Sequence, residues 1–583
     1  MFSEFIKAHP PGRLELQAPK LSSSDCDWID DYCLFYRTCP YPVLTASQYM
    51  AFAREGDRAT WERPYFLRRR KLIAALLDAL YNLQGLDPVI DGLWLICEET
   101  TWVISAHNGA EHAGVEPTPP RLLPEGAPYV DLFAAQTAMI LSLTSGLLSA
   151  QLDAISPTIR RRVKDEIERR VLTPFETRDD FWWMGVIRRD LCNWTPWIVS
   201  NVMLTACLWV EDAKRLWTIL RRGCAMLDRY LDCLPNDGGC DEGAGYWSMA
   251  GGALLDALEL LERVTGARMN LENDEKFLNI MRFPMRAWLF GDYFMNYADC
   301  DARPSIPAER LQYAGARLGD PELLAFGVRF RNENTLSDTV EDTPQLWRLL
   351  SAWAHPEIDA PEARPLRDVW LPDLQIRNLH RGRYIALSCK GGVNAGSHNH
   401  NDCGSFIVCY KGLPEIVDAG NMTYTGKTFS EERYTLWNIR SRYHNVPQIG
   451  EFEQAAGLAH RARSVEPTPD GMVMDIAPAY PEAAGVEICQ RELRADECGV
   501  TLRDVVRTRE PRTLTEVFLM RCPPERSVMT ITPSVPMRME VEEVPVDDSR
   551  MAENFPHSLW RVAYSAPAAT AHDITFRIER NDA

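Results

Sequence analysis

Hydrophobic residues in the first part of the chain recur every three or four positions, which is the spacing of amphipathic helices. This spacing predicts helices over residues 66–83, 130–152, 198–220 and 251–264. Short segments rich in polar residues, glycine or proline separate these helices. No sequence repeat of fixed length accompanies them, so the pattern favours an array or closed ring of helical hairpins over a regular solenoid.

The pattern changes near residues 364–372, and the long helical periodicity does not return. Short runs that alternate apolar and polar residues replace it, and glycine and proline interrupt them at close intervals. We therefore predict an α+β multidomain protein with a helical domain at residues 1–368 and an antiparallel β-sandwich at 369–583. The predicted strands cover residues 384–388, 405–410, 415–417, 471–476, 501–506, 514–519 and 574–578.

Length and charge narrow the classes of protein to which the chain can belong. A chain of 583 residues is too long for one hydrophobic core, so we expect about two to four domains. The 82 acidic and 63 basic residues give a net charge of -19, which argues against a general nucleic-acid-binding protein. A local basic pocket for an anionic ligand is compatible with that net charge.

The sequence carries no sign of export or membrane insertion. Its first residues, MFSEFIKAHPPGRLELQ, lack the basic, apolar and small-residue regions of a signal peptide. No apolar run reaches the roughly 18 residues of a membrane span. The 16 cysteines are scattered without a C-x-x-C pair, as is typical of free thiols in a reducing compartment. We expect a cytoplasmic protein without membrane or nucleic-acid partners.

Two histidines lie two residues apart in the segment GSHNHNDCGSF, in a chain that has 11 histidines. On a strand, His398 and His400 would point to the same face. Together with Asp402, Asp418 or His444 they offer nitrogen and oxygen ligands that suit zinc or a similar divalent ion. The spacing matches no zinc-finger pattern, and the alternative is that these polar residues cap turns of a sandwich.

A second group of candidate residues lies in the helical part. Asn193 stands in the segment RDLCNWTPWIVSN, in a tryptophan-rich loop just before a predicted helix. Tyr246 stands in the glycine-rich segment DEGAGYW, where glycine allows a ligand to approach the backbone closely. The alternatives are a helix cap for Asn193 and a half-buried packing role for Tyr246.

These segments together resemble the heparinase II/III-like family. The C-terminal part carries SHNHNDCGSF, VDAG, TFSEERY and RSRYHN in the order of the family signature. The helical part is similar in ICEETTW with AHNG, in the NWTPW loop, and in DEGAGYW followed by an apolar helix. The resemblance implies an incomplete α/α toroid followed by an antiparallel β-sandwich, with a sugar chain bound between the two domains.

The resemblance further implies a polysaccharide lyase that cleaves uronic-acid polymers by β-elimination. The C5 proton becomes acidic only when the sugar carboxylate is neutralised, so hydrogen-bond donors must face the charge that develops there. By resemblance Asn193 neutralises the carboxylate, and His398 assists or acts as base toward the opposite epimer. Tyr246 would remove the C5 proton and protonate the leaving oxygen, which requires a site that favours the phenolate.

The resemblance also implies a divalent metal of the zinc type. Its ligands would be His400, Asp418 and His444, which match the family in residue type. We expect a structural role in which the ion ties loops together and fixes His398 two residues away. No organic cofactor is expected.

Further residues are candidate contacts for an anionic oligo- or polysaccharide. Arg433, Arg440 and Arg442 can bind carboxylate or sulfate as two-pronged donors, with structural salt bridges as the alternative. The loop at Asn193 has no acidic residue before the next helix, which favours lyases of the asparagine type. The candidates for stacking on sugars or lining the groove are His107, Trp182, Trp183, Trp194 and Trp247, and we prefer Trp194 and Trp247 among the tryptophans.

The sequence leaves the choice of polymer open. A glycosaminoglycan is the preferred substrate, and alginate or another non-sulfated uronate chain is the alternative. A toroid-fold glycoside hydrolase would need two carboxylates across the scissile bond, whereas Asp241 and Glu242 are adjacent on one loop. A carbohydrate-binding protein without activity is disfavoured because Asn193, Tyr246 and His398 are all present.

Overall fold

The computed structural model describes residues 1–110, 121–331, 345–355, 368–395 and 398–581, and its contacts divide the chain into two units. The helical unit comprises Met1–Leu234, Ser248–Asp274 and Pro307–Ala363. The sheet unit comprises Pro235–Trp247, Glu275–Ile306 and Arg364–Ala583. Two stretches of the predicted first domain thus belong to the sheet unit, while the domain boundary at residue 368 stays a prediction.

Helices α6 (Leu132–Leu147) and α10 (Trp194–Trp209) form the centre of the helical unit. Nearly all residues of both helices are buried, because both are apolar on every side. Helix α10 packs against α6, α11 (Ala213–Cys233) and α12 (Gly251–Thr265). The outer helix α11 is amphipathic and buries one apolar stripe that includes Leu216, Leu220 and Leu227.

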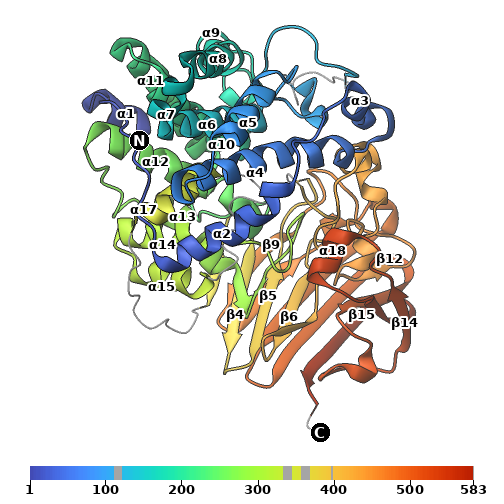
Figure 1. Ribbon diagram of the computed structural model, residues 1–583. Coiled ribbons are helices and arrows are strands. Elements are labelled where there is room, and N and C mark those ends of the chain that lie inside the picture. Colours follow the sequence, from blue (N-terminus) through green and yellow to red (C-terminus); the bar gives the residue numbers. More distant parts are fainter. Residues whose placement is uncertain (111–120, 332–344, 356–367, 396–397, 582–583) are drawn as a thin grey trace. The chain divides into compact units, whose positions relative to one another are not determined.

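The other helices of this unit form further packed pairs, in which α2 contacts α4, α4 contacts α5, and α5 contacts α8. A π-helical turn, η3 (Glu168–Leu172), follows α8. The other helices that the structure describes in this unit have from 5 to 23 residues, and Figure 1 shows most of them at the blue to yellow-green end of the ribbon. Their bounds are α1 Phe2–Ala8, α2 Ser23–Thr38, α3 Ala46–Glu55, α4 Ala59–Tyr81, α5 Asp87–Cys97, α7 Ser149–Ile155, α8 Pro157–Ile167, α9 Thr173–Thr177, α14 Ala308–Leu318, α15 Pro321–Phe330 and α17 Leu346–Ala354.

The predicted continuous helix over residues 198–220 is wrong. Helix α10 ends at Trp209 and α11 begins at Ala213. Asp212 separates them, because its side chain accepts a hydrogen bond from the backbone N–H of Arg215 and so caps the second helix. Residues 211–214 at the break are exposed, and the buried positions of the second helix begin at Leu216.

Buried charges link α12, α14 and α17 inside the helical unit. Arg348 donates to Asp256 at 2.8 Å, and Arg310 donates to Glu259 at 2.9 Å. Glu309 is buried beside Arg310, yet neither oxygen of its carboxyl group has a hydrogen-bond partner among the described residues. Burial raises the pKa of Glu309 to about 6. This carboxyl group therefore holds its proton to a higher pH than an exposed glutamate does.

Replacing Glu309 by glutamine is therefore expected to make stability less dependent on pH. A carboxyl group whose pKa is raised on folding stabilises the fold below its ordinary pKa, and that contribution is lost as pH rises through about 6. Relative to the wild type, Glu309→Gln should gain about 1 kcal/mol between pH 5 and pH 8. Thermal unfolding across this range measures the change. Glu211→Gln, at an exposed position of the same unit, should show none.

The main sheet of this unit has thirteen strands within the described residues, and every pairing in it is antiparallel. The order is β3-β4-β5-β6-β7-β12-β11-β10-β9, while β13 and β14 pair with β15, and β8 pairs with β12. The strands are β3 Val369–Leu371, β4 Ile376–Arg381, β5 Ile385–Lys390, β6 Phe406–Tyr410, β7 Leu413–Ile416, β8 Gln448–Ile449, β9 Arg463–Thr468, β10 Gly471–Asp475, β11 Val486–Ala495, β12 Gly499–Met520, β13 Met529–Pro533, β14 Arg538–Val544 and β15 Leu559–Arg580.

The two longest strands, β12 and β15, hold this sheet together. Each has 22 residues, and they pair from Gly499 opposite Glu579 to Met520 opposite Trp560. The predicted strands at 501–506 and 514–519 both lie in β12, because the polar stretch between them continues the strand. Their side chains alternate between buried and exposed along much of the strand. The predicted order, a helical domain followed by an antiparallel β-sandwich, is confirmed.

Smaller elements complete the sheet unit. Helix α13 (Glu275–Ala287) leads into the short hairpin of β1 (Trp288–Phe290) and β2 (Tyr293–Phe294). Helix α18 (Ser549–Asn554) lies between β14 and β15 in the chain and is drawn in red in Figure 1. No single helix in the described part of the chain is long and apolar enough to span a membrane, and only α6 with α7, bent by 79°, passes that test as a pair.

Candidate functional site

His398 lies in a turn and not on a strand. Its φ is 54°, and the next strand, β6, begins only at Phe406. The expectation that His398 and His400 share a strand face is therefore wrong. The turn is joined to a distant segment, because the backbone N–H of Asp299 donates to the carbonyl of His398 at 3.2 Å. A left-handed conformation at a residue with a side chain is uncommon and is often found at functional sites.

Asp299 connects the two histidines. Its carboxylate lies 2.8 Å from Nδ1 of His398 and 3.1 Å from Nε2 of His400, and it accepts from Arg433 at 2.8 Å. Burial alone would raise its pKa, but the hydrogen bonds from both histidines and from Arg433 hold the pKa of Asp299 well below the ordinary value. An ionised Asp299 thus orients both imidazole rings. The sequence analysis did not identify this residue.

Two tyrosines lie in a row with His398. The hydroxyl oxygens of Tyr246 and Tyr424 are 2.5 Å apart, and the Tyr424 hydroxyl is 3.2 Å from Nδ1 of His398. The rings of Tyr246 and His398 are 5.4 Å apart. Burial raises the pKa of both phenols, so both hydroxyls hold their protons at neutral pH. Tyr424 lies between the VDAG and TFS elements of the family-like motif, and that position could have marked it as a candidate.

Charged side chains lie around this row. Glu242 is buried, with its carboxylate 3.6 Å from Nε2 of His398. The guanidinium of Arg550, from α18, lies 5.6 Å from the Tyr424 ring and is paired with Asp301 at 2.8 Å. The sequence reasoning did not single out Arg550, because α18 lies outside the quoted motifs. The row therefore has one cation beside the phenols and two anions, Glu242 and Asp299, beside the imidazole.

Three predicted substrate contacts of the sheet unit have partners within the protein. Arg433 is buried, bonded to Asp299 and to the backbone carbonyls of Asn399 and Thr428. Arg440 is paired with Glu453. The buried Trp247 donates its indole N–H to the carbonyl of Ile280 at 2.7 Å. These contacts favour structural roles, and substrate binding by these residues stays a prediction.

The helical unit brings several other candidates together. Asn193 is buried directly before α10, whose first residue is Trp194. The ring of His107 lies 4.6 Å from that of Trp194, and its Nδ1 is 2.8 Å from a carboxylate oxygen of Asp131. Trp182 lies 5.1 Å from Trp194, whereas Trp183 is fully buried and donates to the carbonyl of Val130.

The predicted metal ligands lie together in the sheet unit. His400, Asp418 and His444 are fully buried, and one ligand atom from each lies within 4.8 Å of the others. Nδ1 of His400 and Nε2 of His444 have no hydrogen-bond partner among the described residues. A buried imidazole nitrogen without a partner is costly, and a divalent ion would satisfy it. The donor set therefore fits a metal ion, and its identity as zinc is a proposal.

Zinc is expected to raise the thermal unfolding midpoint of the wild type, and EDTA is expected to reverse the rise. An ion that binds only the folded state stabilises it by mass action. His400→Ala should abolish the response and lower the midpoint by itself, whereas His398→Ala should retain the response because His398 is not a ligand. A wild type that responds to neither zinc nor EDTA would contradict the metal site.

Comparisons with known proteins identify what this chain is similar to. Residues 363–563 match the family model described as Heparinase II/III-like, C-terminal. The crystal structure of heparinase III is similar at a TM-score of 0.62 and 11% identity, covering 97% of this chain and 93% of that one. Heparan sulfate lyase HepC from Pedobacter heparinus is similar at 0.58 and 11%, covering 100% and 88%.

A third similar structure is the Streptomyces coelicolor A3 chondroitin AC lyase in complex with chondroitin sulphate, at a TM-score of 0.51 and 11% identity, covering 96% of this chain and 83% of that one. At such identities these structures establish a shared fold. A search of curated proteins found no match. The resemblance identified from the sequence motifs is confirmed by the family match and the shared fold.

Proposed function

Because residues 363–563 form a Heparinase II/III-like C-terminal domain in a chain with the fold of heparinase III, we propose that this protein is a polysaccharide lyase that cleaves glycosaminoglycans by β-elimination. The observation that carries the proposal is the row of Tyr246, Tyr424 and His398, held by Asp299 in the sheet unit. The similar structures include a heparan sulfate lyase and a chondroitin AC lyase in complex with chondroitin sulphate, which supports a glycosaminoglycan as the substrate class.

In the proposed reaction the sugar carboxylate is neutralised first. The amide of Asn193 donates to the carboxylate oxygen on which negative charge develops, without adding a charge of its own. We assign His398 to the same carboxylate by family resemblance, and Asp299 and the left-handed turn fix the direction of its ring. Neutralisation makes the C5 proton acidic enough to be removed.

Tyr246 then moves the proton. Once the Tyr246 hydroxyl has lost its own proton to solvent, the phenolate accepts the proton from C5, and the hydroxyl so formed donates that proton to the O4 leaving group as the C4–O bond breaks. Burial raises the pKa of Tyr246, while the hydrogen bond with Tyr424 and the charge of Arg550 lower it and so support the phenolate. Tyr424 and Arg550 are therefore assigned to activation of this tyrosine.

The proposed metal acts outside these steps. An ion at His400, Asp418 and His444 would supply a fixed positive charge that ties the turn before β6 to the segments after β7 and before β8. It would also hold His400 in the orientation in which it bonds Asp299. Zinc is the proposed ion because two imidazoles and one carboxylate suit it.

Incubation of the full-length protein with heparan sulfate, chondroitin sulfate, hyaluronan and alginate tests the proposal. We expect the ultraviolet absorbance of a new C4=C5 double bond with a sulfated glycosaminoglycan. If only alginate gives product, the substrate is a non-sulfated uronate polymer and not a glycosaminoglycan. Saturated products would indicate a hydrolase, and the absence of any cleavage would refute the lyase assignment.

A further inference from the structure

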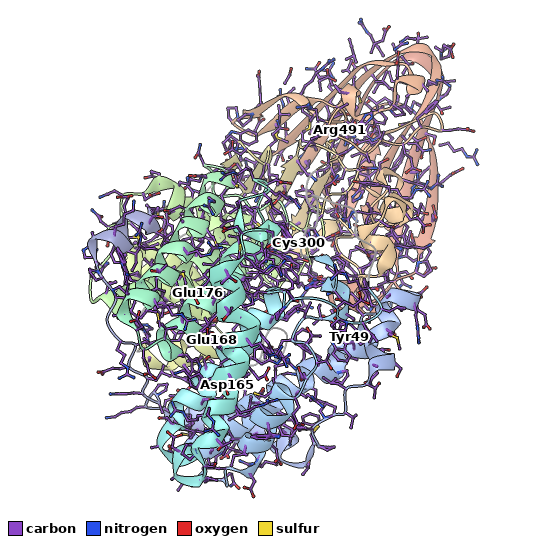
Figure 2. The ribbon with its side chains drawn as sticks, turned by 90° about the horizontal axis from the view of Figure 1, so that it is seen from above. Tyr49, Asp165, Glu168, Glu176, Cys300 and Arg491 are labelled. Atoms are coloured by element: carbon purple, nitrogen blue, oxygen red, sulfur yellow. The ribbon has the colours of Figure 1, made fainter. Side chains whose placement is uncertain are left out.

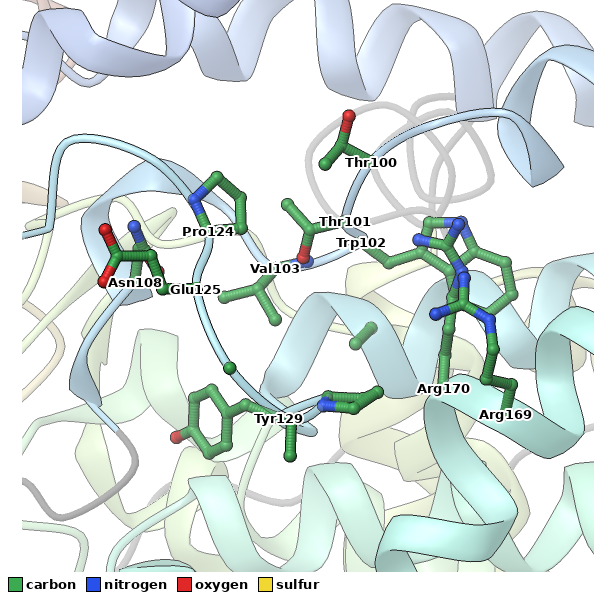
Figure 3. A pocket seen from close by; sticks show the side chains of 14 residues that line it. Thr100, Thr101, Trp102, Val103, Asn108, Pro124, Glu125, Tyr129, Arg169 and Arg170 are labelled. Carbon is green, nitrogen blue, oxygen red and sulfur yellow. The ribbon is translucent and has the colours of Figure 1, made fainter.

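Two cavities adjoin in the helical unit, near the loop that follows α5. The first, which we call the Trp61 cavity, measures about 280 Å³ and lies among residues of α3, α4 and α5. The second, the Arg169 cavity, measures about 240 Å³. Figure 3 shows it with Arg169 and Arg170 on a helical turn and with Thr100 and Thr101 on a loop. Thr100, Thr101 and Pro124 line both cavities, so they form a shared wall.

Trp61, which lines this cavity, has a hydrogen-bond donor without a partner. Trp61 is 6% exposed, and its indole N–H has no partner among the described residues. The ring of Tyr49 packs against it edge-on at 4.7 Å and holds it in place. Buried indole N–H groups are normally paired, so this donor points to a ligand that supplies an acceptor.

A second donor lies on the same face of α4. Arg68 follows Trp61 by seven residues, which places it about two turns, or about 10 Å, further along the helix. Its Nε donates to the carbonyl of Pro42 at 2.8 Å and its Nη1 to Glu99 at 3.2 Å. Its Nη2 makes no hydrogen bond within the part of the chain that the structure describes. The cavity thus offers donors at two separated points, as an elongated ligand requires.

The charge around the Trp61 cavity favours an anion. Glu99 is buried and shared by two guanidinium groups, those of Arg68 and Arg69, so one positive charge is in excess. Glu98 also lines this cavity, but it is exposed to solvent, which screens it.

The Arg169 cavity also has an excess of positive charge. Glu166 is paired with three arginines, Arg162 at 3.4 Å, Arg169 at 2.7 Å and Arg170 at 2.6 Å. Arg169 and Arg170 stand on the π-helical turn η3, a local irregularity that is frequent at functional sites. Glu125 on the opposite wall offsets one of the charges. A cationic region in a protein of net charge -19 marks a binding site for an anion.

One residue that lines the Arg169 cavity is a neighbour of the candidate reaction residues of the helical unit. Asn108 lines it and directly follows His107 in the chain. The ring of His107 lies 4.6 Å from Trp194, the residue after Asn193. A ligand that fills both cavities would therefore end near the residue that we assign to carboxylate neutralisation.

We infer that the two cavities form one extended subsite for acidic sugar residues of a glycosaminoglycan chain, remote from the bond that is cleaved. Carboxylate or sulfate groups bind Arg68 and Arg169, and a sugar oxygen accepts from the indole N–H of Trp61. Thr100 and Thr101, which line both cavities, contact the part of the sugar chain that passes from one cavity to the other. This inference rests on the proposed function and adds to it a requirement for chain length.

Calorimetric titration of full-length Tyr246→Phe with heparan sulfate and chondroitin sulfate octasaccharides tests the subsite without cleavage. Ala46 is exposed and lines the Trp61 cavity, so Ala46→Trp should block it and weaken octasaccharide binding about 10-fold. Arg169→Gln should weaken binding and reduce its salt dependence, and Trp61→Phe should weaken binding while it preserves the ring. The matched controls Ser47→Trp and Arg161→Gln, which line neither cavity, should bind like the parent.

The outcomes separate this inference from the proposed function. If the wild type cleaves a glycosaminoglycan but the cavity variants bind both octasaccharides like the controls, the subsite is refuted and the lyase assignment stands. If no polymer is cleaved but Ala46→Trp weakens binding, the subsite stands and the lyase assignment fails. If there is neither cleavage nor binding, both are refuted.

Discussion

Tyr246→Phe is expected to lower kcat on the cleaved glycosaminoglycan by about 1,000-fold, with little change in KM. The substitution removes one oxygen atom, the one that carries the C5 proton to the leaving group in the proposed reaction. The ring remains, so its packing 5.4 Å from the His398 ring is preserved. Initial rates from the absorbance of the unsaturated product measure the effect, and circular dichroism verifies that the fold is intact.

Two further tyrosine variants sharpen this result. Tyr424→Phe removes the hydrogen bond to Tyr246 but leaves its hydroxyl in place, so we expect a smaller loss of about 10- to 100-fold. Tyr564→Phe is the matched control, because Tyr564 is buried in the sheet and donates to the carbonyl of Ile531, away from this row. If Tyr246→Phe retains wild-type kcat, the proton-transfer role is misassigned. If Tyr424→Phe loses more activity than Tyr246→Phe, then Tyr424 and not Tyr246 transfers the proton.

The sequence predicted those residues of the site that stand inside family-like motifs. His400, Asp418 and His444 were recognised as candidate ligands from residue type and family-like order, and they do lie together. Tyr246 and His398 were recognised in the same way, and their rings are near each other in the sheet unit. Their individual roles in catalysis are proposals still to be tested.

The residues that connect these parts could not be predicted from local pattern. Asp299 lies about a hundred positions before His398 in a segment without helical or strand periodicity, and only the tertiary fold brings them within 2.8 Å. The turn at His398 could not be distinguished from a strand, because the alternation of side chains alone does not reveal a left-handed φ. Trp247 was chosen for its neighbours in sequence, while its buried N–H bonded to Ile280 depends on a distant helix.

Arginine 491 is a second residue whose importance only the fold reveals, and Figure 2 labels it in the sheet unit. It is fully buried on β11 and bonded to Asp504 at 2.7 Å and Glu516 at 2.9 Å, both on β12. Its Nη1 also donates to the carbonyls of Gly404 and Asn445. Gly404 follows His400 by four residues, and Asn445 directly follows His444, so this arginine also fixes the loops that carry two proposed metal ligands.

Arg491→Met is therefore expected to destabilise the sheet unit by about 3–5 kcal/mol, because it leaves buried carboxyl groups without their cation. Scanning calorimetry of the full-length protein should show the sheet transition at a lower temperature while the helical transition moves little. The variant should also respond less to zinc, because the loops that carry His400 and His444 lose their shared anchor. A sheet transition unchanged from the wild type would refute this account.

Glu516→Gln is the matched comparison, because it keeps the shape of the buried cluster. Burial, and then the neighbouring Asp504, raise the pKa of Glu516 well above its ordinary value, so this carboxyl group holds its proton to a higher pH than an exposed glutamate does. A group with a raised pKa stabilises the fold at low pH and loses this contribution as pH rises through the folded value. Glu516→Gln should therefore cost little at pH 7 and should make the sheet transition less sensitive to alkaline pH. A loss at pH 7 as large as that of Arg491→Met would mean that Glu516 is ionised in the folded protein and that the cluster depends on both carboxylates.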